Sequence, residues 1–147
     1  MLLIVVVLVV FLANTCVLGT FPQIDTSTAS MLNLTEVNST FTKLNGDWMY
    51  KLIWDENITR DALQEAIQQY STTADFKIRG KKAFIKSLRN DTTMAQKVEE
   101  ALVYPFMRAQ KFLRLLPWYT YYGCNGVYNT KSGQDVLTAV CLYREKI

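Results

Sequence analysis

The chain has 147 residues, of which 50% are hydrophobic and 20% are charged, with a net charge of +3 and no histidine. Without an imidazole, the chain has no Ser-His-Asp triad, no His-ligated zinc site and no histidine general base. We therefore expect no enzymatic activity, no metal site and no cofactor. A chain of this length is typical of a single domain.

The N-terminal segment predicts a secretory signal peptide over residues 1–19. Residues 2–13 form an unbroken apolar run, which is too short for a membrane-spanning helix of about 20 residues. Val17 and Gly19 suit the positions that signal peptidase reads before its cleavage point. We expect a secreted, extracellular protein with no integral membrane segment after cleavage. No Lys or Arg precedes the apolar run, which leaves an uncleaved anchor as the alternative.

The cysteines predict one disulfide. Cys16 would leave with the signal peptide, so Cys124 and Cys141 remain as an even pair in an oxidising compartment. Four Asn-x-Ser/Thr sequons also remain, and in a secreted chain such sequons mark surface positions and N-glycosylation sites. We expect two of the four to be used. They are Asn33, Asn38, Asn57 and Asn90.

The first part of the mature chain predicts two helices. Residues 20–30 are rich in Ser and Thr and are expected to form a flexible lead-in to one domain over residues 31–147. Apolar residues at helical spacing predict a helix over 31–43. After a short aromatic segment, Asp55 is expected to cap a second helix over 58–70.

The middle of the chain is strongly basic. Residues 71–80 are expected to form a loop, and residues 82–89 fit a short helix with three of the cations on one face. This cationic cluster is a candidate site for heparan sulfate or another anionic surface, and the alternative is a solvated face. The cluster comprises Lys77, Arg79, Lys81, Lys82, Lys86 and Arg89.

Two more helices are expected before Pro117. Thr93 and Gln96 form a capping box at the start of the first, Pro105 should interrupt it, and the second runs over 106–116. The amphipathic faces of these helices could enclose a small apolar ligand, although such faces more often pack on the protein's own core. Three cations of the second helix are expected on an exposed flank: Arg108, Lys111 and Arg114.

Beyond Pro117 the pattern is that of strands. Residues 118–122 are aromatic and β-prone, Asn125-Gly126 and residues 130–133 are turn signals, and residues 135–143 are apolar on both faces of a strand. A strand that is apolar on both faces needs a cover on each side. The predicted class is therefore α+β, with a small antiparallel sheet flanked by helices and a disulfide-linked C-terminal hairpin.

Two segments carry a family resemblance. Residues 49–66 resemble the Lys-Leu-x-Trp-Asp junction and following helix of CAP-superfamily proteins, the cysteine-rich secretory, antigen 5 and pathogenesis-related group. Residues 118–124 with 136–143 resemble the closing hairpin of that superfamily. The chain looks like a degenerate, trimmed CAP domain of the venom-allergen-like kind that nematodes secrete. The resemblance implies an α-β-α sandwich in which the two hairpin cysteines pair.

The same resemblance implies that the metal-binding cleft of the CAP superfamily has been lost. That cleft uses two His and two Glu, whereas the matching positions here would repel a divalent cation or leave it without ligands. The resemblance places the two His at Thr35 or Val37 and at Lys111 or Phe112, one Glu at Lys81, and the other at Glu99 or Glu100.

These patterns predict a secreted, non-catalytic binding protein. It would act either as an extracellular effector or as a carrier of a small apolar ligand, so that its partner is an extracellular protein or a lipid and not a nucleic acid. Two alternatives remain open. Gly46-Asp47-Trp48 suggests a lipocalin-like ligand binder, and Leu116-Pro117-Trp118 near the disulfide suggests a cystatin-like protease inhibitor.

Overall fold

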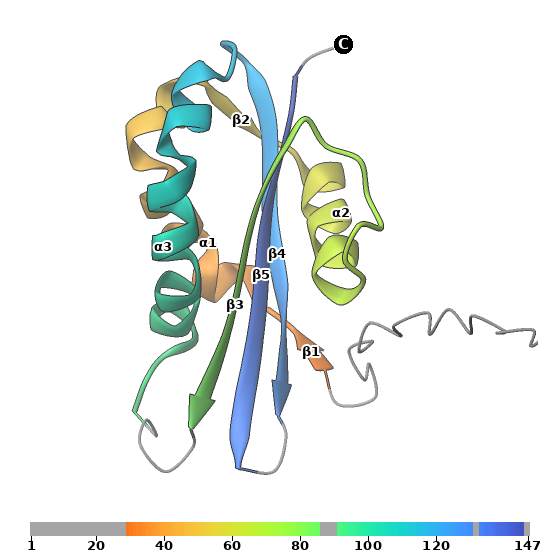
Figure 1. Cartoon of the computed structure of the whole chain (residues 1–147), viewed down its shortest axis with the longest axis vertical. Helices are drawn as coiled ribbons and strands as arrows, with labels where there is room; N and C mark the ends of the chain where they lie inside the picture. Colours follow the sequence, from red (N-terminus) through yellow and green to blue (C-terminus); the bar gives the residue numbers. More distant parts are fainter. Residues whose placement is uncertain (1–28, 86–90, 131–132, 146–147) are drawn as a thin grey trace, which may run out of the picture.

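The computed structural model of the chain describes residues 29–85, 91–130 and 133–145. The predicted signal peptide and residues 20–28 of the predicted lead-in lie outside these ranges. The elements follow in chain order (Figure 1): the strand β1 (Ala29–Met31), the helix α1 (Leu34–Asn45), a 3-10 helix η1 (Gly46–Lys51), β2 (Leu52–Trp54), α2 (Glu56–Ile67), β3 (Phe76–Ile85), α3 (Met94–Leu115), β4 (Thr120–Thr130) and β5 (Gln134–Arg144).

The strands form one five-stranded sheet between helices. β1, β4, β5 and β3 follow one another across the sheet in antiparallel pairs, and β2 pairs in parallel with the first part of β4. Figure 1 shows α1 and α3 on one side of the sheet and α2 on the other. The predicted α+β class, with a small and mainly antiparallel sheet flanked by helices, is confirmed.

Each face of the sheet has its own apolar core. On one face, Phe41 of α1 and Leu102 of α3 pack in the same cluster as Tyr143 of β5. On the other face, Ala62 of α2 clusters with Val140 of β5. β5 is therefore buried on both faces, as its sequence predicts.

A disulfide joins the two central strands. Cys124 and Cys141 are linked, with an S–S distance of 2.03 Å, and they are direct partners in the ladder between β4 and β5. Both side chains are fully buried in the core beneath α1 and α3. The expected pair thus fixes the register of the two strands on which the rest of the sheet assembles.

The helix starts follow their sequence signals. Asp55 caps α2 by accepting hydrogen bonds from the backbone N–H groups of Asn57 (2.8 Å) and Ile58 (2.9 Å). Thr93 and Gln96 form the predicted capping box at the start of α3. Local side-chain chemistry therefore places both starts correctly.

The loop predicted over 71–80 is confirmed only for residues 71–75, and the helix predicted over 82–89 is wrong where the structure describes it. Residues 76–85 form β3, which pairs with β5 over ten residues. Phe76, Ile78 and Phe84 lie at even positions of the strand and pack in the core beneath α3. Pairing along the whole strand outweighs the short helical pattern of its second half.

Two other local signals are overridden. Asn125-Gly126, expected as a turn, lies inside β4, where Asn125 pairs with Val140. Pro105, expected to separate two helices, lies inside the continuous α3. Because residues 94–115 form one helix, this stretch does not supply the two helices of the ligand groove considered as an alternative, and its apolar side packs on the core as favoured.

Gly80 lets β3 approach α3 beside Pro105. Proline has no N–H, so Pro105 cannot donate the usual hydrogen bond to the carbonyl oxygen of Ala101, four residues earlier. That oxygen faces Gly80, because a Cβ added to Gly80 would lie 2.2 Å from it. Strand and helix are therefore closer here than any side chain on residue 80 permits.

Gly80→Ala is expected to lower the free energy of unfolding by about 2–3 kcal/mol, because the added methyl group meets backbone atoms that cannot move aside. Gly46→Ala is the control, since a Cβ there has no neighbour within 4 Å. Its expected effect is within about 0.5 kcal/mol. Urea unfolding followed by circular dichroism measures both variants, and equal values would contradict the close approach of β3 to α3.

Candidate functional site

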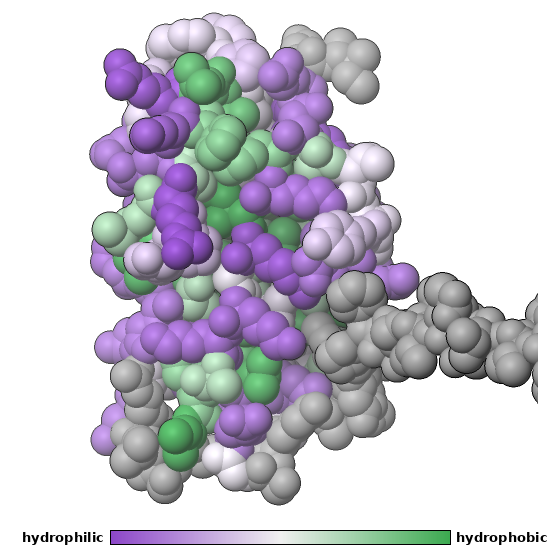
Figure 2. Space-filling model, viewed as in Figure 1, coloured by the Kyte–Doolittle hydropathy of each residue, from purple (hydrophilic) through white to green (hydrophobic). Residues whose placement is uncertain are grey.

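The C-terminal half of α3 presents a surface that is both apolar and cationic. Its four large apolar side chains are between 58% and 78% exposed, and three exposed cations accompany them. The chain has no Asp or Glu between Glu100 and Asp135, so this half of the helix contributes no carboxylate. Figure 2 shows hydrophobic residues exposed between hydrophilic ones on the side of the molecule that bears α3 and β3. We call this surface the cationic aromatic face; it comprises Tyr104, Met107, Arg108, Lys111, Phe112, Arg114 and Leu115.

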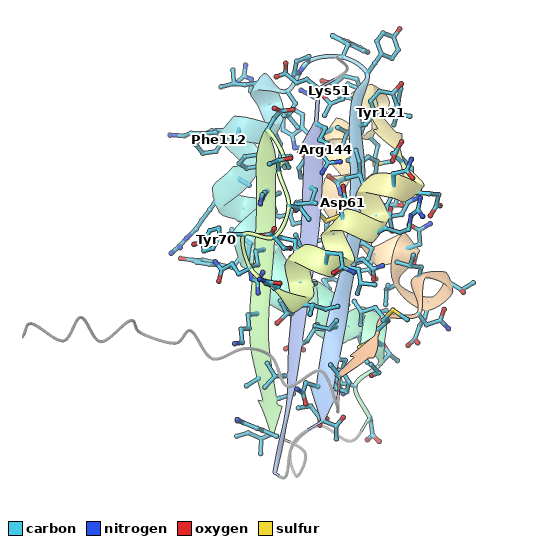
Figure 3. All side chains as sticks on the ribbon, turned by 90° about the vertical axis from the view of Figure 1, so that its right-hand side faces the viewer. Lys51, Asp61, Tyr70, Phe112, Tyr121 and Arg144 are labelled. Atoms are coloured by element: carbon cyan, nitrogen blue, oxygen red, sulfur yellow. A yellow bond between two sulfur atoms is a disulfide. The ribbon has the colours of Figure 1, made fainter. Side chains whose placement is uncertain are left out.

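A groove lies between this face and the edge strand β3. Phe76 stacks on Phe112 with ring centroids 5.3 Å apart, and Phe112 lies beside β3 in Figure 3. The guanidinium carbon of Arg108 lies 4.5 Å from the centre of the Tyr104 ring. The lining includes three cations and no carboxylate, so an acidic ligand suits it best. The groove has a volume of about 340 Å³ and is lined by Phe76, Lys77, Ile78, Arg79, Tyr104, Pro105, Arg108, Ala109 and Phe112.

Glu65 of α2 fixes the start of β3. It is only 2% exposed, and its carboxylate accepts hydrogen bonds from the backbone N–H groups of Tyr70 (2.8 Å) and Thr72 (3.0 Å) and from the Lys77 ammonium group (3.0 Å). Arg79 donates to the main-chain carbonyl oxygen of Glu65 (2.6 Å). Burial alone would raise the pKa of Glu65, but these hydrogen bonds outweigh it and hold the pKa below its ordinary value. Glu65 therefore stays ionised and positions two cations of β3.

A second ion pair joins α2 to the end of β5. The Arg144 guanidinium lies 2.7 Å from the Asp61 carboxylate, and Arg144 also donates to the carbonyl oxygen of Thr73 (2.6 Å). Figure 3 labels Arg144 and Asp61. Together with Glu65, this contact holds the segment between α2 and β3 at two points. These contacts therefore fix the position of the first residues of β3, which line the groove.

The six cations that the sequence groups together do not share one face. Lys77 and Arg79 lie on the α2 side of β3, whereas Lys82 lies on the opposite side with its ammonium group 3.0 Å from Glu100 of α3. The helical face expected for Lys82 is therefore wrong, because a strand sends neighbouring side chains to opposite sides. Of the remaining three, Lys81 is exposed, and Lys86 and Arg89 lie outside the described residues.

Sequence reasoning gave no role to the cations of α3. Arg108, Lys111 and Arg114 are exposed as expected, but the groove and the exposed apolar side chains beside them were missed. The available signal was the long stretch without Asp or Glu. A stretch of this kind leaves cations without nearby carboxylates and so makes a surface positive.

Lys51 is a buried cation that holds the end of α3. It is 4% exposed, and its ammonium group donates to the carbonyl oxygens of Arg114 (3.0 Å) and Leu116 (2.7 Å). A cation at the C-terminus of a helix complements the helix dipole. Burial lowers the pKa of Lys51. This contact fixes the helix end that carries the cationic aromatic face.

Tyr128 forms a polar contact near the other end of the sheet. Its hydroxyl group donates to Asp135, and Lys97 donates to the hydroxyl oxygen (2.7 Å). Burial and then the neighbouring Asp135 raise the pKa of Tyr128, so the phenol stays protonated. Across the described residues, no group of three His, Cys, Asp or Glu side chains could hold a metal ion.

Three of the four predicted glycosylation sites lie among the described residues. Asn33, Asn38 and Asn57 are exposed. Asn33 caps α1 through its side-chain oxygen, which accepts a hydrogen bond from the N–H of Thr35 (3.1 Å) and leaves the amide nitrogen available for a glycan. Asn90 lies outside the described residues. Asn33 immediately precedes α1, Asn38 lies on α1 and Asn57 lies on α2.

The structure is a small, disulfide-linked α+β domain with an exposed apolar and cationic surface on α3. Residues 40–145 match the family model described as 15 kDa excretory/secretory protein. The chain is 62% identical over 108 residues to the 30 kDa antigenic glycoprotein of Trichostrongylus colubriformis, a match that covers 74% of this chain and 78% of the relative. It is 32% identical over 110 residues to the 15 kDa excretory/secretory protein of Haemonchus contortus, covering 70% and 73%. No solved structure matches the chain. The chain therefore belongs to the 15 kDa excretory/secretory protein family, and it is a secreted, extracellular protein.

The predicted membership of the CAP superfamily is wrong. The matching family model is that of the 15 kDa excretory/secretory protein, and the relatives found are a 30 kDa antigenic glycoprotein and a 15 kDa excretory/secretory protein. The resemblance depended on a Trp-Asp helix start and on a cysteine hairpin. Asp55 is an ordinary N-cap and Cys124–Cys141 an ordinary cross-strand link, and unrelated folds use both devices. The interpretation of a lost metal cleft fails with the resemblance.

Within the described ranges, no helix combines the length and apolar character that a membrane crossing requires.

Glu65→Gln is expected to flatten the pH dependence of stability. A carboxylate with a lowered pKa stabilises the fold fully above its unfolded pKa, about 4.3 for Glu, and loses this contribution as the pH falls. At pH 7 the variant should be less stable by roughly 1–3 kcal/mol, and the difference should shrink toward pH 3. Urea unfolding at a series of pH values measures this.

Glu99→Gln is the matched control, because Glu99 pairs with Lys43 (2.7 Å) at an exposed position. An exposed pair contributes less than about 1 kcal/mol. Parallel pH curves for wild type and Glu65→Gln would contradict the role assigned to Glu65.

Two of the four sequons are expected to carry glycans when the chain is secreted from eukaryotic cells. Removal of N-glycans by peptide-N-glycosidase F should lower the intact mass by two glycans and convert two Asn residues to Asp. Single Asn→Gln variants at residues 33, 38, 57 and 90 identify the used sites by mass spectrometry. A secreted chain with no glycan would refute the expectation.

Proposed function

We propose that this chain is a secreted, non-catalytic binding protein of the effector type, which binds an acidic surface of an extracellular protein through its cationic aromatic face. The observation that carries the proposal is the composition of that face. Four large apolar side chains are more than half exposed beside three cations. Aromatic and Arg side chains are the residues enriched at the centres of protein–protein interfaces.

Charge supports an acidic partner. Arg108 and Lys111 are exposed on the outer side of α3. Lys77 and Arg79 also border the groove, but they lie on the α2 side of β3, where Glu65 holds them. A positive surface attracts an acidic partner during diffusion and opposes the approach of a basic one. The exposed aromatic rings then supply apolar area once the partner has docked.

The absence of catalysis is part of the proposal. The sequence has no histidine, and the groove is lined by cationic, aromatic and aliphatic side chains, a set that lacks an acid–base pair. The shifted pKa values of Glu65, Lys51 and Tyr128 each follow from contacts that hold loops, helix ends or strands in place.

The effector interpretation is favoured over that of a ligand carrier. Small-ligand sites are enclosed and mostly apolar, whereas a third of the residues lining the groove are cations. The lipocalin alternative needs an eight-stranded barrel, but the described residues form a five-stranded sheet with helices on both sides. The family match gives no support to the cystatin-like alternative.

Surface plasmon resonance against an array of extracellular proteins, from acidic to basic, tests the proposal. The immobilised mature protein should bind acidic members of the array at physiological ionic strength. The double variant Arg108→Glu, Lys111→Glu should lose affinity by at least about tenfold, because two attractive charges become repulsive. Arg60→Glu is the matched control on the exposed side of α2, and it should change affinity by less than about twofold.

Two results would contradict the proposal: no binding to any acidic protein of the array, or equal losses of affinity in the double variant and the control. Circular dichroism of each variant checks that the fold is retained. All three substituted side chains are exposed, so a loss of binding can be assigned to charge.

A further inference from the structure

The edge strand β3 places backbone hydrogen-bonding groups beside the groove. β3 is the last strand on its side of the sheet and pairs with β5 over ten residues. Among the described residues, no strand pairs with its outer edge (Figure 1). Alternate N–H and C=O groups of an edge strand point away from the sheet and can pair with a further strand.

The two sides of this edge differ in chemistry. Lys77, Arg79 and Lys81 occupy odd positions, on the α2 side of β3. Phe76 and Ile78 occupy even positions, on the α3 side, where they line the groove. A strand laid along the edge would therefore meet cations on one side and apolar side chains on the other.

Charge determines which strand can add to β3. Pairing with β3 of a second copy would bring the cations of both strands together, and lysines on edge strands prevent self-association in this way. An acidic strand would replace that repulsion by cross-strand attraction. The cations concerned are Lys77, Arg79 and Lys81, which lie on one side of β3.

We propose that β3 binds an extended acidic segment of a partner protein by strand addition. Acidic side chains of the segment would face Lys77, Arg79 and Lys81, and apolar side chains alternating with them would enter the groove beside Phe76 and Phe112. Main-chain hydrogen bonds supply affinity in this mode, and the two sides supply specificity. The inference rests on the proposed function, since it specifies how the acidic partner is recognised.

The geometry sets the length and pattern of the segment. β3 has ten residues, which corresponds to about 33 Å at 3.3 Å per residue. The groove runs along residues 76–79, so apolar side chains matter most at the end of the segment that lies there. The recognised pattern is strict alternation of acidic and apolar residues.

A set of labelled peptides tests strand addition to the mature protein by fluorescence anisotropy. The first peptide matches the length of β3 and alternates Glu with Val. A second has the same composition with all Glu residues before all Val residues. The third and fourth repeat the alternating sequence with N-methyl groups on every Val amide or on every Glu amide, which removes N–H donors from one edge without changing charge.

The alternating peptide should bind at least about tenfold more tightly than the block peptide. One N-methylated peptide should lose binding by a similar factor of about ten while the other retains it, because alternate N–H groups of a strand point to opposite edges. Which peptide fails also reveals whether the added strand is parallel or antiparallel. Equal binding of both methylated peptides and the parent would overturn strand addition, as would no binding of the alternating peptide.

Lys81→Glu tests the same proposal on the protein. Lys81 is exposed on β3, and inverting its charge should weaken the alternating peptide by about tenfold, against less than about twofold for Arg60→Glu. If acidic proteins bind the cationic aromatic face but Lys81→Glu and N-methylation have no effect, strand addition fails and the proposed function stands. If Arg108→Glu, Lys111→Glu also binds acidic proteins normally, the proposed function itself fails.

Discussion

Burial of β5 on both faces is the constraint on which the structure depends. Its side chains alternate between a core beneath α1 and α3 and a core beneath α2, so the sheet is stable only between two helical layers. The link between Cys124 and Cys141 holds the central pair of strands in register. Glycines let the helices close in on either side: a Cβ on Gly80 would meet α3, and one on Gly123 would lie 2.3 Å from the backbone nitrogen of Thr59 in α2. β4 and β5 are thus enclosed by the helices, whereas β3 lies at the edge of the sheet and pairs with β5 alone among the described strands.

The position of β3 at the edge of the sheet determines what its cations can contact. Glu65 lies buried against the sheet and holds Lys77 and Arg79 at the start of β3, while the outer side of α3 adds Arg108 and exposed aromatic rings across a groove. Cations on an edge strand prevent pairing with a second copy. They also favour an acidic partner. In the proposed strand addition, one set of side chains therefore opposes pairing with a second copy and attracts an acidic partner.

The sequence predicts those features that local chemistry determines. Asp55 and Thr93 cap helices as their neighbours indicate, and the apolar pattern of residues 135–143 correctly requires helices on both faces of the sheet. Features determined by distant partners were missed. β3 has a basic and partly helical local pattern, but ten pairs with β5 impose a strand. Pro105 stays within α3 because Gly80 accommodates the helix at the point where the proline removes a hydrogen bond. The groove joins residues about thirty positions apart, a distance that no local pattern reveals.

Hydrogen–deuterium exchange of the unliganded protein tests most directly whether β5 is enclosed while the outer edge of β3 is accessible. The amides of β5, paired on both sides by β3 and β4, should exchange only through global unfolding. Along β3, amides that bond to β5 should be equally slow, and the alternate amides that point outward should exchange orders of magnitude faster. Uniform protection of all β3 amides at the level of β5 would show that the edge is covered, and would contradict an edge available to a partner.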